Sequence, residues 1–221
     1  MISNRLNQIV NFIKDDHDVA DIGSDHGLLL VLLNERNFPN KVLGVENKIG
    51  PYKNLERTIK LINKPNFSSN LSSGLDNVSK DYQTIVIAGM GFNNIKEIVL
   101  RDIDKGNYRE TFIIDSHTNQ DEVRTFFYNL GYKVDDEMII YEDSIYYDII
   151  RFSLNRININ YNSLELEFGP FNLKNKPVAF INMCNEKINK LKYVLTQISD
   201  EAKKSEIKEK IIKLEEIVDE N

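Results

Sequence analysis

Residues 19–30, VADIGSDHGLLL, place two aspartates, a histidine and two glycines in the turn after a short hydrophobic run. A dinucleotide-binding loop has the spacing G-x-G-x-x-G, in which the second glycine lets the backbone approach a pyrophosphate. Asp25 stands at that position here, and its carboxylate would repel a diphosphate. The spacing D-x-G-x-D-x-G suits a ligand with cationic groups, and S-adenosylmethionine carries both an ammonium and a sulfonium. The residue types therefore favour a methyl donor over NAD.

The acidic residues of this turn also have a structural interpretation. Asp21 could cap the turn, and Asp25 with His26 could cap the helix that follows, because aspartate is favoured at helix starts. The capping role and the ligand-binding role of Asp25 are compatible, so both interpretations stay open.

Two later segments extend the candidate ligand site. Glu46 ends the second predicted strand, where an acidic side chain can accept hydrogen bonds from both ribose hydroxyls of an adenosine; the alternative is a solvated loop carboxylate. In the segment SSGLD, Gly74 predicts a tight turn near the expected adenine position, and Ser73 and Leu75 could frame the base. Glu46 indicates an adenosine ligand without distinguishing S-adenosylmethionine from NAD.

The fourth and fifth predicted strands end in further polar or glycine-rich segments. Glycines on both sides of Met90, in IVIAGMGFNN, permit close approach of a substrate to the backbone. The fifth strand leads to Asp115, His117 and Asn119 on the same rim. We interpret Asn119 as the cap of the next helix and His117 as a surface residue.

Alternating strands and helices must position these residues. Hydrophobic runs predict strands over 18–22, 41–46, 66–71, 82–90 and 111–116, separated by amphipathic helices, and a first helix precedes them. Two further runs, 133–143 and 144–154, are separated only by a tight acidic turn, which predicts an antiparallel hairpin. The pattern predicts an α/β fold with a mostly parallel, Rossmann-like sheet, whose ligands bind beyond the carboxyl ends of the strands.

The C-terminal part of the chain differs in character from residues 1–154, which we predict to form the ligand-binding catalytic domain. Residues 155–177 are polar and read as an irregular connector. Two apolar stripes follow and predict a helical hairpin or coiled coil, so residues 155–221 form the second predicted domain. The stripes contain Ile181, Ile188, Leu191, Leu195 and Ile198 in the first helix and Ile207, Ile211, Leu214 and Val218 in the second.

Composition limits the remaining possibilities. The chain has 221 residues, 41% of them hydrophobic and 28% charged, which is enough for one sizeable core with a smaller module. No run approaches the ~18 apolar residues of a membrane span, so we expect a cytoplasmic protein with no membrane partner. One cysteine, Cys184, and three scattered histidines give no metal-ligand spacing, so we expect no metal. The net charge of -6 does not indicate nucleic-acid binding by bulk charge.

Several of these segments together resemble a known family. ADIGSDHGLL, GVE, IAGMG and the N-terminal RL, followed by a helical C-terminal arm, are similar to the bacterial tRNA (adenine(22)-N1)-methyltransferase family. The resemblance covers essentially the whole chain. It implies a class I S-adenosylmethionine-dependent methyltransferase domain, a C-terminal coiled coil, tRNA as partner with no obligate protein partner, and methyl transfer to N1 of an adenine in the D-loop.

The resemblance and the chemistry of methyl transfer to adenine N1 together give candidate roles for particular positions. Met90 and Phe92 are the candidates for the surface on which the target adenine stacks, and Asn119 is a candidate substrate contact. Asp25 is a candidate for electrostatic stabilisation of the methylated, cationic base. The expected donor-site residues are Arg5, Asp21, Gly23, Ser24, Asp25, His26, Glu46, Ser73, Gly74, Ala88, Gly89 and Met90.

Three departures from the family pattern leave alternatives open. Phe92 replaces a usual glycine, Ser73 replaces a usual acidic residue that would bind adenine, and His117 begins H-T-N where Q-P-N is usual. The alternatives are a methyltransferase for another RNA site or a small molecule, and a binding protein with a degenerate methyltransferase fold. An NAD-dependent enzyme is disfavoured by Asp25.

Overall fold

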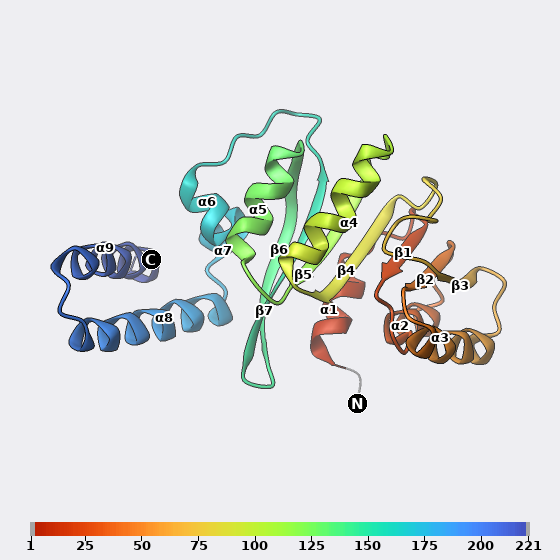
Figure 1. The fold of residues 1–221 in the computed structure, drawn as a ribbon, viewed down its shortest axis with the longest axis horizontal. Helices are drawn as coiled ribbons and strands as arrows, with labels where there is room; N and C mark the ends of the chain where they lie inside the picture. Colours follow the sequence, from red (N-terminus) through yellow and green to blue (C-terminus); the bar gives the residue numbers. More distant parts are fainter. Residues whose placement is uncertain (1–2, 220–221) are drawn as a thin grey trace.

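A computed structural model describes residues 3–219, with a seven-stranded sheet at the centre (Figure 1). The strand order is β3-β2-β1-β4-β5-β7-β6. Neighbours from β3 to β5 are parallel, and β7 is antiparallel to both β5 and β6. The strands are β1 (Val19–Ile22), β2 (Val42–Glu46), β3 (Phe67–Leu71), β4 (Thr84–Met90), β5 (Thr111–Ser116), β6 (Tyr132–Glu142) and β7 (Ile145–Leu154).

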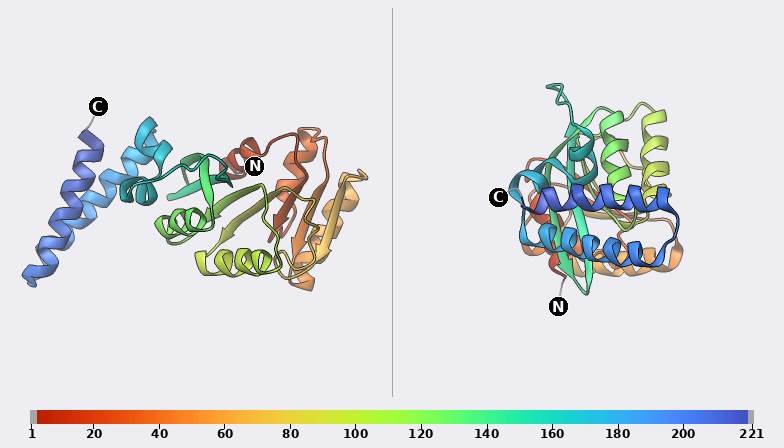
Figure 2. Two further views of the ribbon diagram at one scale, coloured as in Figure 1. Left: turned by 90° about the horizontal axis from the view of Figure 1, so that it is seen from above. Right: turned by 90° about the vertical axis from the view of Figure 1, so that its left-hand side faces the viewer.

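Helices cover both faces of this sheet (Figures 1 and 2). Successive side chains of β4 point to opposite faces, as in any strand. Ile85 and Ile87 pack in the cluster on the side of α4 (Phe92–Asp104) and α5 (Gln120–Asn129). Val86 packs in the cluster on the side of α1 (Asn4–Phe12), α2 (Leu28–Glu35) and α3 (Ile49–Ile62). Burial on both faces explains why β1 and β2 are continuous hydrophobic runs broken only by glycine and acidic residues.

The end of β4 carries an irregularity that shapes the carboxyl edge of the sheet. Ala88 is paired with Asp115 and Met90 with Ser116, so Gly89 is an extra residue in the ladder. Gly89 has a φ of +81°, a conformation that glycine adopts without steric cost. The bulge interrupts the regular strand geometry between Ala88 and Met90, next to the candidate site.

The β6–β7 hairpin fixes the N-terminus of α1. The Glu142 carboxylate accepts hydrogen bonds from the backbone N–H groups of Asn4 at 2.7 Å and Arg5 at 3.1 Å. These two donors lie in the first turn of the helix, where they have no partner within it. The contact holds Arg5 beside the carboxyl ends of β4 and β5 and lowers the pKa of Glu142.

The connector is more ordered than its sequence predicts. It contains two short helices, α6 (Ser163–Phe168) and α7 (Pro170–Asn175), so the expectation of an irregular segment was wrong. Asn162 and Glu165 form a reciprocal capping box at the start of α6, and Pro170 occupies the first turn of α7. These signals are local and lie within a segment too short to show a helical period.

The C-terminal arm is an antiparallel pair of helices, α8 (Val178–Gln197) and α9 (Glu201–Asp219), at one end of the elongated molecule (Figure 2). Phe180, Cys184 and Ile188 pack on Ile211 and Leu214, so the predicted stripes do pair. The same cluster includes Ile139 of β6 and Phe168 of α6. Since the arm shares this core with the sheet, the division into domains at residue 154 stays a prediction.

The α/β sheet with its terminal antiparallel hairpin and C-terminal helix pair is confirmed. Among residues 3–219, no helix has the length and apolar character needed to cross a membrane.

Candidate functional site

Two adjoining cavities open at the carboxyl ends of β1, β2 and β4. The first has a volume of about 160 Å³ and the second about 330 Å³, and Gly23 lines both. The Met90 side chain lies over Gly23, where a Cβ atom would approach Met90 Cε to 2.4 Å. Glycine is favoured at this position by its φ of +79°, and a larger residue would also require the flexible end of the Met90 side chain to move. We call the two cavities together the donor cleft.

The donor cleft gathers nearly all the expected donor-site residues. Gly89 is the exception, because its backbone forms the bulge behind the cleft wall. The first cavity is lined by Arg5, Asp21, Gly23, Ser24, Asp25, His26 and Ala88, and the second by Gly23, Glu46, Ser73, Gly74 and Met90, together with other residues.

The β1–α2 turn is held against the end of β2. The backbone N–H groups of Gly23 and Ser24 both donate to the carbonyl of Val45. The N–H of Asp25 donates to the Glu46 carboxylate, which is only 7% exposed. Glu46 is therefore a fixed part of the cleft wall, and the interpretation of it as a solvated loop carboxylate is wrong.

Asp25 and His26 project outward from this turn. Their side chains are each 62% exposed, and His26 Nε2 lies 3.6 Å from Asp25 Oδ2. The N-cap of α2 is Gly27, with a φ of 70° and no side-chain cap, so the proposed capping by Asp25 and His26 is wrong. Asp25 has a φ of 46°, which is uncommon for a residue other than glycine. Its carboxylate is thus free to face a ligand at the cleft mouth.

Asp21 is the buried acid of the cleft. It is 6% exposed, and burial is the main reason that its pKa is raised to about 7, with a further contribution from the nearby charge of Glu46. A buried carboxylate without a cation beside it is costly. A cationic group entering the first cavity would offset that cost, which is the electrostatic fit expected for an ammonium or sulfonium.

Replacing Asp21 with asparagine should make stability less dependent on pH. The folded-state pKa of about 7 lies above the unfolded value of 3.8, so the folded protein holds an extra proton between them. Stability of the wild type should consequently fall as the pH rises from about 4 to 7 and level off above. Asp21→Asn should be the more stable form at pH 8, by up to about 4 kcal/mol, and differ little at pH 4. Urea unfolding at both pH values measures this, and a constant difference would contradict it.

A second group of side chains lies beside the bulge at Gly89. Arg5 Nη1 donates to the buried Asp115 Oδ2 at 3.0 Å, and the guanidinium lies 4.8 Å from the centre of the Tyr147 ring. The His117 ring packs edge-on against Tyr147, with ring centres 6.2 Å apart. A Cβ atom at Gly89 would lie 3.5 Å from His117 Nε2 and 4.0 Å from Arg5 Nη1. Arg5, His117 and Tyr147 thus surround the end of β4.

Tyr147 was missed by sequence reasoning. It comes from β7, an antiparallel strand whose alternating pattern carries no motif for a site. Only the placement of β7 beside β5 brings it to the carboxyl edge.

The ion pair between Arg5 and Asp115 holds Arg5 in place. Burial raises the pKa of the Asp115 carboxyl, and the positive charge of Arg5 opposes this shift.

Two residues expected at the substrate side, Phe92 and Asn119, do not line the donor cleft. Phe92 is 5% exposed, packs edge-on against Phe126 at 5.7 Å, and lines a cavity between α4, α5 and α6. Phe92 is the first residue of α4, and its side chain points into the core. Its ring therefore has no exposed face on which a base in the donor cleft could stack. Asn119 is exposed at the N-cap position of α5, but its side chain donates to Glu122 rather than capping the helix. The expected capping role of Asn119 is wrong.

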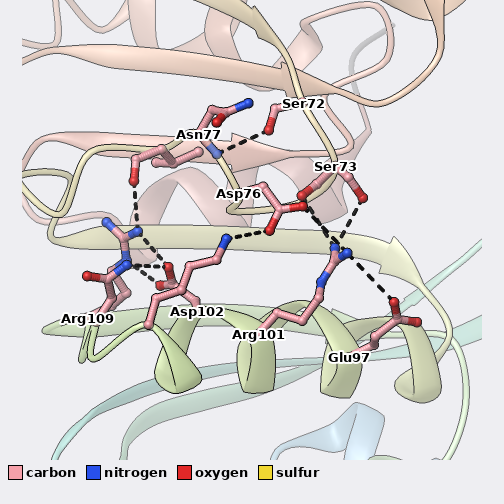
Figure 3. Close-up of polar contacts among 11 residues, drawn as sticks. Ser72, Ser73, Asp76, Asn77, Glu97, Arg101, Asp102 and Arg109 are labelled. Carbon is pink, nitrogen blue, oxygen red and sulfur yellow. Dashed lines mark hydrogen bonds and ion pairs between the residues drawn. The ribbon is translucent and has the colours of Figure 1, made fainter.

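The turn after β3 is fastened to α4 (Figure 3). Arg101 Nη2 donates to the Ser73 hydroxyl at 3.1 Å and to the Ser73 carbonyl at 3.4 Å. Further along, buried Arg109 donates to Asp102 at 2.7 Å and to the carbonyl of Ser79 at 2.6 Å. Gly74 packs so closely that a Cβ would approach Ile98 Cγ1 to 2.8 Å. The contacts of Ser73 and Gly74 with Arg101 and Ile98 fix part of the wall of the second cavity.

Three larger or similar cavities lie outside the donor cleft, along α5, α6 and the arm. Their volumes are about 430, 200 and 510 Å³, and Asp121 and Glu167 line all three. They contain no glycine turn or strand end of the kind that surrounds an adenosine. Among the described residues, no group of three or more histidine, cysteine or acidic side chains is placed to hold a metal ion.

Comparison with known proteins agrees with this geometry. Residues 2–150 match the family model described as "Methyltransferase domain". The tRNA (adenine(22)-N(1))-methyltransferase of Bacillus subtilis is 26% identical over 222 residues, covering 96% of this chain and 92% of its own.

Solved structures share the whole fold. TrmK of M. capricolum, determined in complex with S-adenosyl-homocysteine, is 28% identical, has a TM-score of 0.87 and covers 99% of this chain and 98% of its own. A protein of the NADB-Rossmann superfamily from Streptococcus agalactiae is 25% identical, has a TM-score of 0.89 and gives the same coverage. The similarity thus includes both the sheet and the helical arm.

Proposed function

The chain belongs to the methyltransferase domain family, and on that premise we propose that it transfers a methyl group from S-adenosylmethionine to N1 of adenine 22 in the D-loop of tRNA. The observation that carries the donor assignment is the placement of two buried carboxyl groups, Asp21 in the first cavity and Glu46 in the second, on either side of the Gly23 turn. The full-length similarity to the B. subtilis enzyme supports the tRNA substrate.

The cleft residues divide into a base end and a reacting end. Glu46 would accept hydrogen bonds from the ribose hydroxyls, and the turn at Ser73 and Gly74 would contact the base. Asp21 and Arg5 line the first cavity, where an amino group and a carboxylate of opposite charge would find partners. Met90, between the two cavities, would border the reacting centre.

The reaction requires mainly positioning. When bound, S-adenosylmethionine supplies an electrophilic methyl group on its sulfonium. The neutral N1 of adenine has a lone pair, so the protein must align it in line with the carbon–sulfur bond that breaks. The methylated base is cationic, and the exposed carboxylate of Asp25 at the cleft mouth would stabilise it.

A paired adenine must leave its base pair to expose N1, and aromatic side chains commonly hold such a base. With Phe92 buried, His117 lies beside Gly89 at the end of β4 and Tyr147 packs against it, and both rings remain at least partly exposed. We assign them the role of contacting the target base.

Truncating Tyr147 should therefore weaken use of the tRNA substrate. Base–aromatic stacking contributes about 1–3 kcal/mol, so Tyr147→Ala should lower kcat/KM for tRNA by about 10- to 100-fold. Affinity for S-adenosylhomocysteine should change less than threefold. Tyr141→Ala at the exposed hairpin tip is the matched control, with tRNA turnover unchanged. Equal turnover by Tyr147→Ala and wild type would remove the ring from the substrate site.

The net charge of -6 must be compatible with a polyanionic substrate. Lys187, Lys210 and Lys213 line the cavity between α6 and the arm, although Glu167 pairs with Lys213 at 2.6 Å. Lys210 also pairs with Glu206 at 2.7 Å, so two of these three ammonium groups already have an acidic partner. If they meet phosphates, tRNA affinity should fall as salt increases.

Methyl transfer from labelled S-adenosylmethionine tests the proposal. Unmodified tRNA should accept label, whereas the same tRNA with the D-loop target adenine changed to guanine should not. Donor binding without label on either tRNA would overturn the tRNA assignment and favour a small-molecule substrate. Loss of donor binding altogether would favour a binding protein with a degenerate site.

A further inference from the structure

Arg101 and Ser73 form part of the wall of the second cavity of the donor cleft. Both line the cavity that also contains Glu46. The guanidinium of Arg101 lies over the turn and donates from Nη2 to both the hydroxyl and the carbonyl of Ser73 (Figure 3). Arg101 Nε is buried and has no hydrogen-bond partner among residues 3–219.

This contact fixes the hydrogen-bonding character of the Ser73 hydroxyl. A serine hydroxyl has one hydrogen and two acceptor positions. One acceptor position is occupied by Arg101 at 3.1 Å. The hydroxyl hydrogen and the second acceptor position remain for a ligand, because Ser73 is exposed to the cavity. The turn can thus either donate to a ligand or accept from it.

The carboxylates that contact Arg101 are already paired with cations, and of these Glu97 lines the cavity whereas Asp76 lies outside it. Asp76 receives Lys105 Nζ at 2.6 Å and lies 3.5 Å from Arg101 Nη1, and the Lys105 contact lowers the pKa of Asp76. Glu97 lies 3.9 Å from Arg101 Nη1. A purine edge at this wall therefore contacts the Ser73 hydroxyl, which can donate or accept, and the Arg101 guanidinium. It does not contact an unpaired carboxylate there.

The pairing pattern decides how the wall discriminates between purines. A protein group that only accepts hydrogen bonds favours the 6-amino group of adenine, which donates. It rejects a 6-oxo purine, because the oxygen at position 6 and the protein group are then both acceptors. A hydroxyl that can donate or accept satisfies either group. We propose that the base subsite of this protein does not discriminate between 6-amino and 6-oxo purines, so that it takes inosine-type as well as adenosine-type nucleosides. The proposal rests on the donor assignment above, which places the base at this turn.

Calorimetric titration of the full-length chain with S-adenosylhomocysteine and S-inosylhomocysteine tests the proposal without any turnover. The two dissociation constants should agree within about threefold. A preference of tenfold or more for S-adenosylhomocysteine would overturn the proposal, and absence of binding by both would overturn the donor assignment and the proposal together.

Two variants show whether the Ser73 wall is responsible. Ser73→Asp places a group that only accepts at the same position, and it should restore a preference of at least tenfold for S-adenosylhomocysteine. Lys105→Met removes the ion pair to Asp76 without contacting Ser73, and its ratio should stay that of the wild type. An unchanged ratio in Ser73→Asp would show that the base does not meet this residue. Ser73 is exposed, so neither its replacement nor that of Lys105 disturbs the core.

Discussion

Glu46→Gln should lower the affinity for S-adenosylhomocysteine by about 100-fold. A hydrogen bond to a charged group contributes about 1.5–3 kcal/mol, and glutamine can accept through only one oxygen. That oxygen remains the partner of the Asp25 N–H, so the β1–α2 turn should keep its conformation. The binding free energy lost, about 3 kcal/mol, then comes from the hydrogen bonds to the ribose. It corresponds to a dissociation constant about 100-fold higher.

Isothermal titration measures this change, with Glu35→Gln as the matched control. Glu35 is exposed in the last turn of α2 and lines neither cavity of the donor cleft, so its replacement should leave affinity within twofold. A Glu46→Gln protein that binds S-adenosylhomocysteine as tightly as the wild type would place the ribose away from Glu46.

The donor half of the cleft follows from local sequence. Asp21 and Glu46 end adjacent parallel strands, and strand ends of a parallel sheet share one edge. Gly23 and Gly89 mark backbone with positive φ, which glycine signals directly. For these positions, spacing along the chain was sufficient to predict proximity in space.

The substrate half depends on packing between distant elements and was predicted less well. Phe92 follows a glycine-rich strand end, but the phase of α4 turns its ring toward Phe126 and the core. Tyr147 reaches the site only because β7 inserts next to β5. Arg101 meets Ser73 because α4 packs beside the turn after β3. No periodicity or motif in one segment encodes such contacts.

Arg124→Met should cost the protein about 3–5 kcal/mol of unfolding free energy. Arg124 is buried on α5 and donates through Nε to Glu137 at 2.9 Å and through Nη2 to Asp148. Glu137 also accepts the backbone N–H groups of Phe171 and Asn172 in α7, so these contacts join α5, the hairpin and the connector. Removing the cation leaves two buried carboxyls without a cationic partner, which is the costly case.

The loss should depend on pH in a defined direction. Burial raises the pKa of both Glu137 and Asp148, and Arg124 opposes that shift. Without Arg124 the folded-state pKa values rise further above the unfolded ones, so the folded variant takes up protons as the pH falls. The deficit relative to wild type should consequently be smaller at pH 5 than at pH 8 in urea unfolding.

Arg156→Met is the control that tests whether burial of Arg124 causes the loss of stability. Arg156 pairs with Glu110 at 2.7 Å, but the two side chains are 70% and 44% exposed. Exposed pairs contribute at most about 1 kcal/mol, so this variant should unfold nearly as the wild type does at either pH. Similar losses in Arg124→Met and Arg156→Met would mean that the buried group does not hold the connector to the sheet. A large loss confined to Arg124→Met would show that this guanidinium stabilises the packing of α5 and α7 against the β6–β7 hairpin.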